Sequence, residues 1–281
     1  MRTVQSRKNE TPPDAATRIE RETLTFQGAL VLLTDALSPS ALFPKAVGTS
    51  TLPVDALATM SDVTFHDFRV LPIFLDSGRR GVPGAVYDTA ALKTNFPAYL
   101  ENPRPKARSA IEEAVRNVAQ HGKIIDQLPA SGQLCFATGA IFLKEFSYLD
   151  QKGRCQKFLV CMVSDEGMGI ENPSHSLAPG VGTWLGENHM GMGYELSDSV
   201  LMLIRSKEGR WFLFDGLHHN TNEGTRLRDR QEGSVDVPPL AELRLPAGHP
   251  GCKKIFVFEH PTSDAENVFQ AILGLIEPLK R

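Results

Sequence analysis

Apolar and polar positions alternate with a helical period over residues 112–122 (EEAVRNVAQHG). Side chains three and four positions apart lie on one face of a helix, so this stretch separates into an apolar stripe and a polar face. The stripe holds Ile111, Val115 and Val118, and the polar face holds Glu113, Asn117 and His121. The pattern predicts a helix that packs on a sheet through one side and presents polar side chains on the other.

A run without polar residues, 158–163 (FLVCMV), precedes the sequence SDEGMGI at 164–170. Continuous apolar character over this length predicts a strand that is buried on both faces. Asp165 then falls at the end of the strand. Gly167 and Gly169 allow the backbone after it to turn tightly and to approach a ligand closely.

The sequence GMGYELS at 191–197 predicts the start of a further helix, whose free N–H groups suit a phosphate. Gly191, Met192 and Gly193 stand at its opening. Apolar runs with turn signals between them predict the strands that follow. These are 200–204, then 211–214 after a turn at Glu208 and Gly209, and a last strand over 251–258.

The first hundred residues alternate strand-like and helical patterns, and we interpret residues 23–101 as a separate small α/β unit. The expected strands are 25–33, 52–65 and 84–87. The expected helices are 41–47, a stretch that begins at Phe68 and continues through Leu71, Phe74 and Leu75, and 94–100. Two prolines in 101–105 predict a linker to the next unit.

The two ends of the chain differ in character. Residues 1–22 are polar and contain prolines, which predicts a disordered tail, and they lack the apolar core of a signal peptide, which predicts a cytoplasmic protein. Thr262, Ser263 and Asp264 begin an amphipathic helix within 262–281. We expect that helix to pack on the N-terminal unit, with a homodimer contact as the alternative.

Composition narrows the classes of function. The chain has 281 residues, of which 41% are hydrophobic and 22% charged, as in a soluble globular protein, and no apolar stretch predicts a membrane span. A net charge of −3 disfavours a nucleic-acid partner, which would need a basic face. The four cysteines form no C-x-x-C pair, so we expect reduced thiols and no zinc site.

In these segments the chain resembles the GHKL superfamily of ATPases, which includes gyrase B, MutL, histidine kinases and the anti-sigma-factor serine kinases. The order of the motifs matches over roughly residues 104–261. The spelling E-A-x-x-N-x-x-x-H-G is most similar to the bacterial anti-sigma-factor kinases. The resemblance implies a Bergerat-type α+β two-layer sandwich over 102–261, with a mixed, mostly antiparallel sheet covered by helices on one face.

The same resemblance implies roles for individual residues. Glu113 corresponds to the acidic residue that orients or deprotonates the attacking group, and Asn117 to the Mg²⁺ ligand. Asp165 corresponds to the carboxylate that binds the adenine amino group. The further nucleotide-binding positions implied are His121, Gly167, Gly169, Ile170, Gly191, Met192, Gly193 and Cys252.

Two departures from the family pattern bear on affinity and turnover. Cys252 stands where the family has Thr, and a thiol is a weaker hydrogen-bonding group than a hydroxyl. A competing alignment places that pair at Gly224 and Thr225. The lid expected over 171–190 contains no Lys or Arg, although phosphoryl transfer needs a cation besides Mg²⁺. Candidates for that cation are Arg116, Lys123, His189, Lys253 and Lys254, or a group on a partner.

The N-terminal unit weakly resembles STAS domains, through 63–67 (VTFHD) and the helix expected after it. In STAS switch proteins a Ser or Thr that accepts phosphate follows the Asp. Phe68 follows Asp67 in this chain, which implies that phosphoacceptor function is lost.

The motifs together predict a regulatory protein that binds ATP or ADP with Mg²⁺ and switches a protein partner. It would act as a slow ATPase or as a Ser/Thr protein kinase of the anti-sigma-factor type. The alternative is a degenerate interaction module that keeps the GHKL fold and no longer depends on ATP. A true histidine kinase is disfavoured, because no helical hairpin with a His precedes the motifs.

Overall fold

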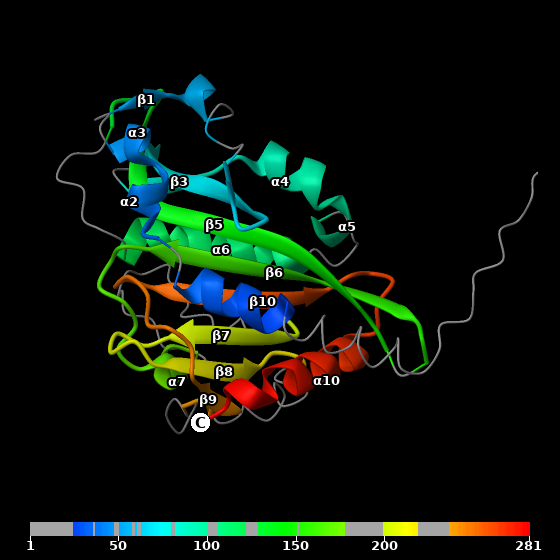
Figure 1. The fold of residues 1–281 in the computed structure, drawn as a ribbon. Helices are drawn as coiled ribbons and strands as arrows, with labels where there is room; N and C mark the ends of the chain where they lie inside the picture. The colour runs from blue at the N-terminus through cyan, green and yellow to red at the C-terminus, as the bar shows by residue number, and fades with distance from the viewer. Residues whose placement is uncertain are drawn as a thin grey trace, which may run out of the picture.

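The computed structural model describes residues 25–35, 37–47, 51–57, 60, 63–79, 82–100, 106–121, 129–150, 152–177, 199–218 and 236–281. These residues form an α+β protein built on one ten-stranded antiparallel sheet (Figure 1). The predicted tail, the linker at 101–105 and most of the predicted lid lie outside the described residues.

Eight strands follow one another across the sheet in the order β2-β3-β5-β6-β10-β7-β8-β9. Two short strands lie off this path, β1 (Leu52–Pro53) on β5 and β4 (Val82–Val86) on β3. The bounds of the eight are β2 Val63–Phe65, β3 Phe68–Arg79, β5 Gln133–Leu149, β6 Cys155–Asp165, β10 Lys253–Glu259, β7 Leu201–Arg205, β8 Trp211–Asp215 and β9 Ala241–Leu243.

The last strand of the chain lies inside the sheet. β10 pairs with β6 on one side and with β7 on the other, although it follows both in sequence (Figure 1). This arrangement places the start of β10 beside the end of β6, because one strand of an antiparallel pair begins where its neighbour ends. The predicted strands 158–163, 200–204, 211–214 and 251–258 are all confirmed, apart from the first residues of the last one.

Helices cover both faces of the sheet. One face packs on helix 25–34, α2 (Pro39–Leu42), α3 (Pro44–Val47) and α10 (Ala265–Ile276). The other face packs on α4 (Thr89–Asn95), α5 (Pro97–Leu100) and α6 (Lys106–His121), and on Leu177, which directly follows α7 (Pro173–Ser176). The described residues also include two short 3-10 helices, η1 (Val54–Ala56) and η4 (Glu277–Leu279). Figure 1 shows helix 25–34 and α10 in front of the sheet and α6 behind it.

The predicted two-layer sandwich over 102–261 accounts for only part of the layering. The described helices within that range, α6 and α7, lie on one face of the antiparallel sheet, and helices from outside it cover the other face, namely helix 25–34, α2, α3 and α10. The reason is visible along β6, where alternate residues enter different cores: Phe158, Val160 and Met162 on one side, Leu159, Cys161 and Val163 on the other. A sheet with two apolar faces needs helices on both.

The first hundred residues do not form a sheet of their own. β3 pairs with β5 from Arg69 opposite Leu143 to Leu75 opposite Cys135, so the sheet continues across the predicted boundary. Phe26 and Leu33 share a core with Val257 of the last strand. The predicted helices at 41–47 and 94–100 and the strand at 84–87 are confirmed in outline.

Three local predictions in this region are wrong. Residues 25–34 are helical rather than extended, and 68–79 form β3 rather than a helix. A turn at His66 and Asp67, both with positive φ, joins β2 to β3, so the helix expected after Asp67 is a strand. Of the strand expected over 52–65, the described residues 52–57, 60 and 63–65 are extended only in β1 and β2, at the two ends.

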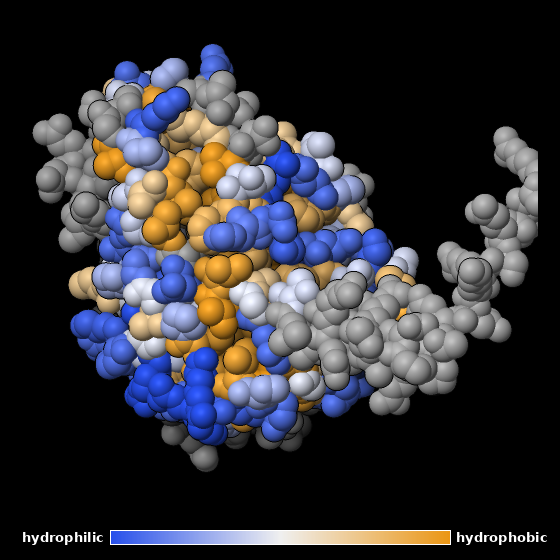
Figure 2. Space-filling model, viewed as in Figure 1, coloured by the Kyte–Doolittle hydropathy of each residue, from blue (hydrophilic) through white to orange (hydrophobic). Residues whose placement is uncertain are grey.

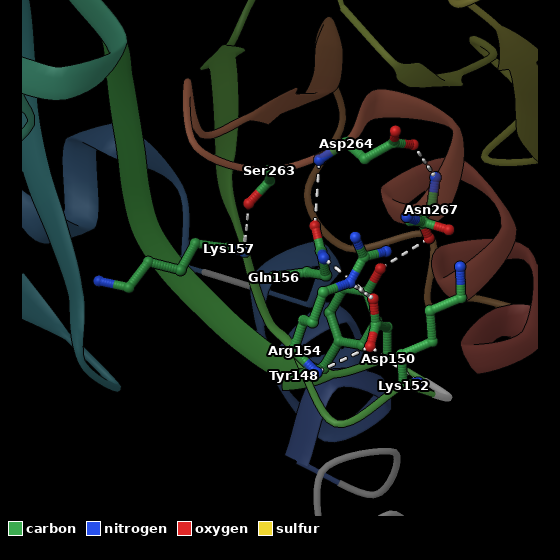
Figure 3. A network of polar contacts seen from close by, with 9 residues as sticks. All are labelled: Tyr148, Asp150, Lys152, Arg154, Gln156, Lys157, Ser263, Asp264 and Asn267. Carbon is green, nitrogen blue, oxygen red and sulfur yellow. Dashed lines mark hydrogen bonds and ion pairs between the residues drawn. The ribbon is translucent and has the colours of Figure 1, made fainter.

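The C-terminal helix α10 is anchored to the β5–β6 hairpin by a polar network (Figure 3). The Asp264 side chain accepts from the Asn267 N–H at 2.9 Å and so caps the helix, while the Asp264 N–H donates to Gln156 Oε1 at 3.0 Å. The Tyr148 hydroxyl donates to the Asn267 carbonyl at 2.6 Å. Gln27 Nε2 donates to the Leu275 carbonyl, also at 2.6 Å, which confirms the expected packing of this helix on the N-terminal residues.

The face that carries helix 25–34 and α10 has apolar side chains at its surface (Figure 2). Val31 and Leu32 are among the exposed large hydrophobic residues. In the part of the chain that the structure describes, no helix has the length and apolar character needed to cross a membrane.

Candidate functional site

A buried corner forms where β6 ends and β10 begins. Asp165, the last residue of β6, is 3% exposed. Its N–H donates to the Cys252 carbonyl at 3.0 Å, and its Oδ1 accepts from the Cys252 N–H at 3.2 Å and the Gly167 N–H at 2.7 Å. Both hydrogen bonds that the carboxylate accepts within the described residues reach Oδ1, which leaves Oδ2 able to accept from a ligand.

Burial raises the pKa of Asp165 from 3.8 to about 6. The N–H groups of Gly167 and Cys252 and the charge of Lys254 act in the opposite direction, and Glu166 raises the pKa further. The group is therefore mostly a carboxylate at pH 7. A buried acceptor with a perturbed pKa at a strand end is typical of a binding site.

Two glycines make the corner compact. Gly251 has φ +122°, and a Cβ there would lie 1.9 Å from the Asp165 carbonyl oxygen, so no other residue fits. Gly169 has φ +79°, and a Cβ there would lie 3.3 Å from the Gly251 carbonyl oxygen. Ile170 follows and forms a bridge with Ser206, which ties the loop to the end of β7. The backbone of this loop is thus held close to the strand ends.

Helix α6 packs on the strand next to this corner. Gly139 of β5 lies opposite Asp165 in the sheet, and a Cβ on Gly139 would lie 2.8 Å from Val118 Cγ1 of the helix. The predicted stripe of Ile111, Val115 and Val118 is buried against the sheet, so the predicted orientation of the helix is confirmed.

The strand beside the corner is irregular. The pairing of β5 with β3 shifts register between Ile73 and Phe74, and Thr138 in this stretch has φ +50°. The Thr138 carbonyl accepts from the Glu166 N–H at 3.2 Å. Thr138 Oγ1 is buried and has no hydrogen-bond partner among the described residues. Bulges of this kind occur frequently beside functional sites.

The polar residues of α6 lie one turn apart on its more exposed side. The Glu113 carboxylate forms an ion pair with Arg116, and both side chains are partly exposed. Asn117 is half-buried and directly precedes Val118, the residue that contacts Gly139. Asn117 therefore lies on the turn of α6 that is nearest to the residue opposite Asp165.

The structure brings together part of the predicted set. Asp165, Gly167, Gly169, Ile170 and Cys252 form the corner, and Asn117 lies on the helix packed beside it. Gly191, Met192, Gly193 and the side chain of His121 lie outside the described residues, as does the competing pair at Gly224 and Thr225. The choice between Gly251 and the competing pair stays a prediction, because residues 224 and 225 lie outside the described part of the chain.

Strand alternation separates two of the candidate cations. Lys254 lies on the same face as Asp165, whose pKa it lowers, whereas Lys253 is fully buried on the opposite face and donates to the Thr34 carbonyl. Lys253 is therefore directed away from the corner. Arg116 is paired with Glu113, and Lys123 and His189 lie outside the described residues.

Three residues around the corner were not predicted from the sequence: Thr138, Gly139 and Glu166. A glycine inside a strand often marks a bulge or a close approach of another element, so Gly139 in the run 133–149 was a usable signal. No local sequence pattern indicated the contact of Glu166, because its partner Ser40 is distant in sequence.

The chain matches no protein-family profile, no curated protein and no solved structure.

Proposed function

We propose that the chain binds ATP and ADP with Mg²⁺ at the Asp165–Cys252 corner and acts as a nucleotide-dependent switch on a protein partner. The observation that carries the proposal is the buried Asp165 carboxylate, of which one oxygen is bonded to two backbone N–H groups. The other oxygen is left for a donor such as the adenine amino group. A buried acceptor of this kind distinguishes ligands by the donor that they supply.

The surroundings of Asp165 bring main chain close to its carboxylate. Gly169 and Gly251 allow the loop after β6 and the start of β10 to pack against each other and against Asp165, because a Cβ on either would meet main-chain atoms. The buried Thr138 hydroxyl, which has no partner among the described residues, is a polar group that a ligand or an ordered water would satisfy.

Magnesium would be held by Asn117 together with the nucleotide phosphates. Protein sites for nucleotide-bound Mg²⁺ use few protein ligands, because the ion keeps waters and phosphate oxygens. Among the described residues no group of three or more His, Cys, Asp or Glu side chains is placed to hold a metal, so an all-protein cage is not part of the proposal. The bound ion would supply charge stabilisation at the phosphates.

Turnover in this proposal is slow. Glu113 would be the base for an attacking water or a partner Ser or Thr hydroxyl, but its carboxylate is paired with Arg116. The pair has to open before Glu113 can accept a proton, and Arg116 would then be free to face a phosphate. We expect a steady ATPase rate below about 1 s⁻¹, the lower end for kinases.

The proposal is tested by thermal unfolding with and without Mg²⁺ and ADP or ATP, in the parent and in Asp165→Asn. The amide would turn a donor toward the adenine amino group while still accepting from the backbone. A ligand that binds only the folded protein, present at about 100 times its dissociation constant, raises the free energy of unfolding by roughly 2.7 kcal/mol. The parent midpoint should rise by several degrees.

In Asp165→Asn that rise should vanish, whereas Asp55→Asn, at an exposed carboxylate of η1 outside the corner, should behave as the parent. No shift in the parent at millimolar nucleotide would refute nucleotide binding. It would favour the alternative, an interaction module that no longer depends on ATP, which the Glu113–Arg116 pair and the thiol of Cys252 favour. Asn117→Ala separates the two functions further, because it should abolish Mg²⁺-dependent binding only in the first.

A further inference from the structure

The residues that directly follow Asp165 and Cys252 both contact the N-terminal segment, which we define as residues 25–47. Glu166 follows Asp165, and Lys253 follows Cys252. Each binds a different part of the segment, Glu166 at Ser40 and Lys253 at Thr34. The corner and the N-terminal segment are therefore linked by two residues, each of which directly follows a residue of the corner in the sequence.

Glu166 makes a two-pronged contact. Its Oε1 accepts from the Ser40 N–H at 2.9 Å and its Oε2 accepts from the Ser40 hydroxyl at 2.8 Å. Hydrogen bonds to a charged acceptor are stronger than those between neutral groups. The Glu166 N–H is itself held by the Thr138 carbonyl, so the main chain at this position is fixed to the sheet.

Lys253 binds the end of helix 25–34. Its ammonium group is fully buried and donates to the Thr34 carbonyl at 3.0 Å, where a cation suits the negative end of a helix. Burial lowers the pKa of Lys253 to about 8, with a further lowering by Arg205 and an opposing effect of Asp35. At pH 7 the group is still mostly charged.

A third element closes on the same point. Gly248 has φ +60°, and a Cβ there would lie 2.2 Å from the Thr34 carbonyl oxygen and 2.4 Å from Lys253 Nζ. Only a residue without a side chain allows the loop before β10, the end of helix 25–34 and Lys253 to meet.

The rest of the segment is attached through apolar packing. Phe26, Leu30, Leu33 and Phe43 are buried in the core on this face of the sheet. The portion nearest the corner, described at 34–35 and 37–42, combines this packing, through the buried Pro39 and through Leu42, with the polar contacts to Glu166 and Lys253.

We infer that the described residues between 34 and 42, which are 34–35 and 37–42, form a regulatory strap whose order is coupled to nucleotide at the corner through the Glu166–Ser40 and Lys253–Thr34 contacts. The inference rests on the proposed function, because it names the element that reports occupancy of the same site. Nucleotide that orders Asp165 and Cys252 also orders the next residues, Glu166 and Lys253, and so tightens the strap. Coupling between two sites is reciprocal, so a variant that loosens the strap should also lower the affinity of the corner for nucleotide.

Hydrogen exchange with and without Mg²⁺ and ADP measures the first half of this coupling. In the parent, ADP should slow exchange of the amides in residues 34–42 by about fivefold or more, the lower end of typical coupling between sites. The dissociation constant of ADP is measured separately by calorimetry on the same full-length protein.

Two variants on the strap side test the reciprocal half. Ser40→Ala removes the hydroxyl donor to Glu166 and touches no residue of the corner. Gly248→Ala forces the Thr34 carbonyl and Lys253 apart. Each variant should speed amide hydrogen exchange in residues 34–42 and raise the dissociation constant of ADP by about fivefold.

Each variant has a matched control. Ser147→Ala removes an exposed Ser on β5. Gly153→Ala imposes the same backbone strain as Gly248→Ala, since Gly153 has φ +71°, but no atom lies within 4 Å of the added Cβ. Both controls should keep the parent's ADP affinity and the parent's exchange in 34–42.

The outcomes separate the two proposals. If ADP binds but leaves exchange in 34–42 unchanged, and both strap variants keep the parent affinity, the coupling is overturned and nucleotide binding stands. If ADP does not bind at all, the proposed function is overturned and the coupling with it. ADP-induced protection together with weaker binding in both strap variants, and in neither control, is the result that the inference requires.

Discussion

Asp165 shows at the scale of one residue how a site conflicts with stability. A carboxylate that is 3% exposed loses hydration, and its two backbone hydrogen bonds do not restore a normal pKa. Folding would be easier with a neutral residue at this position. Departures of this kind from the rules of stable folding are expected where a residue serves function.

The pH dependence of stability should reveal this cost. The folded pKa of Asp165, about 6, lies above its unfolded value of 3.8, so the folded state holds the proton more tightly. The contribution of this group is fully present below pH 4 and is lost as the pH rises through 6, by up to about 3 kcal/mol. Urea unfolding of the parent and of Asp165→Asn at pH 4, 5.5 and 7 measures it.

The free energy of unfolding of Asp165→Asn, minus that of the parent, should therefore increase from pH 4 to pH 7. Asp55→Asn, at an exposed carboxylate of η1, should show no such increase. A difference that stays constant with pH would mean that the Asp165 carboxylate is not strained by burial.

At the scale of elements, α6 was the most predictable part of the chain and β3 the least. The polar and apolar faces of α6 differ so clearly that its stripe could be assigned from spacing alone. β3 is apolar at every position from Val70 to Leu75, and Val70 enters one core while Leu71 and Ile73 enter the other. A strand buried on both faces also contains apolar residues at helical spacing, and periodicity cannot distinguish the two.

The contact between α6 and β5 allows a test of how closely that helix must lie. In Gly139→Ala the new Cβ would lie 2.8 Å from Val118 Cγ1, so we expect a loss of about 1–3 kcal/mol of stability from overpacking. Combining it with Val118→Ala removes the obstructing methyl group. The double variant should then be more stable than the sum of the two single changes predicts, as measured in a urea double-mutant cycle.

Gly274→Ala serves as the reference for this cycle. Gly274 lies in α10 with no atom within 4 Å of an added Cβ, so the substitution should be neutral or stabilising by about 0.5–1 kcal/mol. Additive effects of Gly139→Ala and Val118→Ala would show that the helix and the strand adjust independently.

At the scale of the whole molecule, the sequence predicted elements better than it predicted their assembly. Strands β6, β7, β8 and β10 and helix α10 were predicted from local patterns, whereas β3 was predicted as a helix and no strand was predicted at β5. Asp165 was placed at a strand end from its local pattern, but its proximity to Cys252 was implied only by the family resemblance. That β10 would lie between β6 and β7, and that β3 would extend the same sheet, depends on contacts between distant residues. Such pairings leave no mark in a single stretch of sequence.

The continuity of the sheet makes a fragment the sharpest test of domain organisation. The sequence placed a boundary at 101–102, whereas the structure pairs β3 with β5 along seven residue positions and buries Phe142 and Phe158 beneath helix 25–34 and its neighbours. A chain of residues 102–281 would expose the edge of β5 and an apolar sheet face. An open edge and an uncovered face favour aggregation over folding.

We therefore expect the 102–281 fragment to bind a hydrophobic dye, to associate in solution and to lack a cooperative unfolding transition by circular dichroism. Adding the separate 1–101 fragment should restore cooperative unfolding, because it returns the strands and helices that complete the sheet and its core. A monomeric 102–281 fragment with a sharp transition of its own would instead restore the two-unit organisation. In that case β3 would be an addition to a sheet that is stable without it.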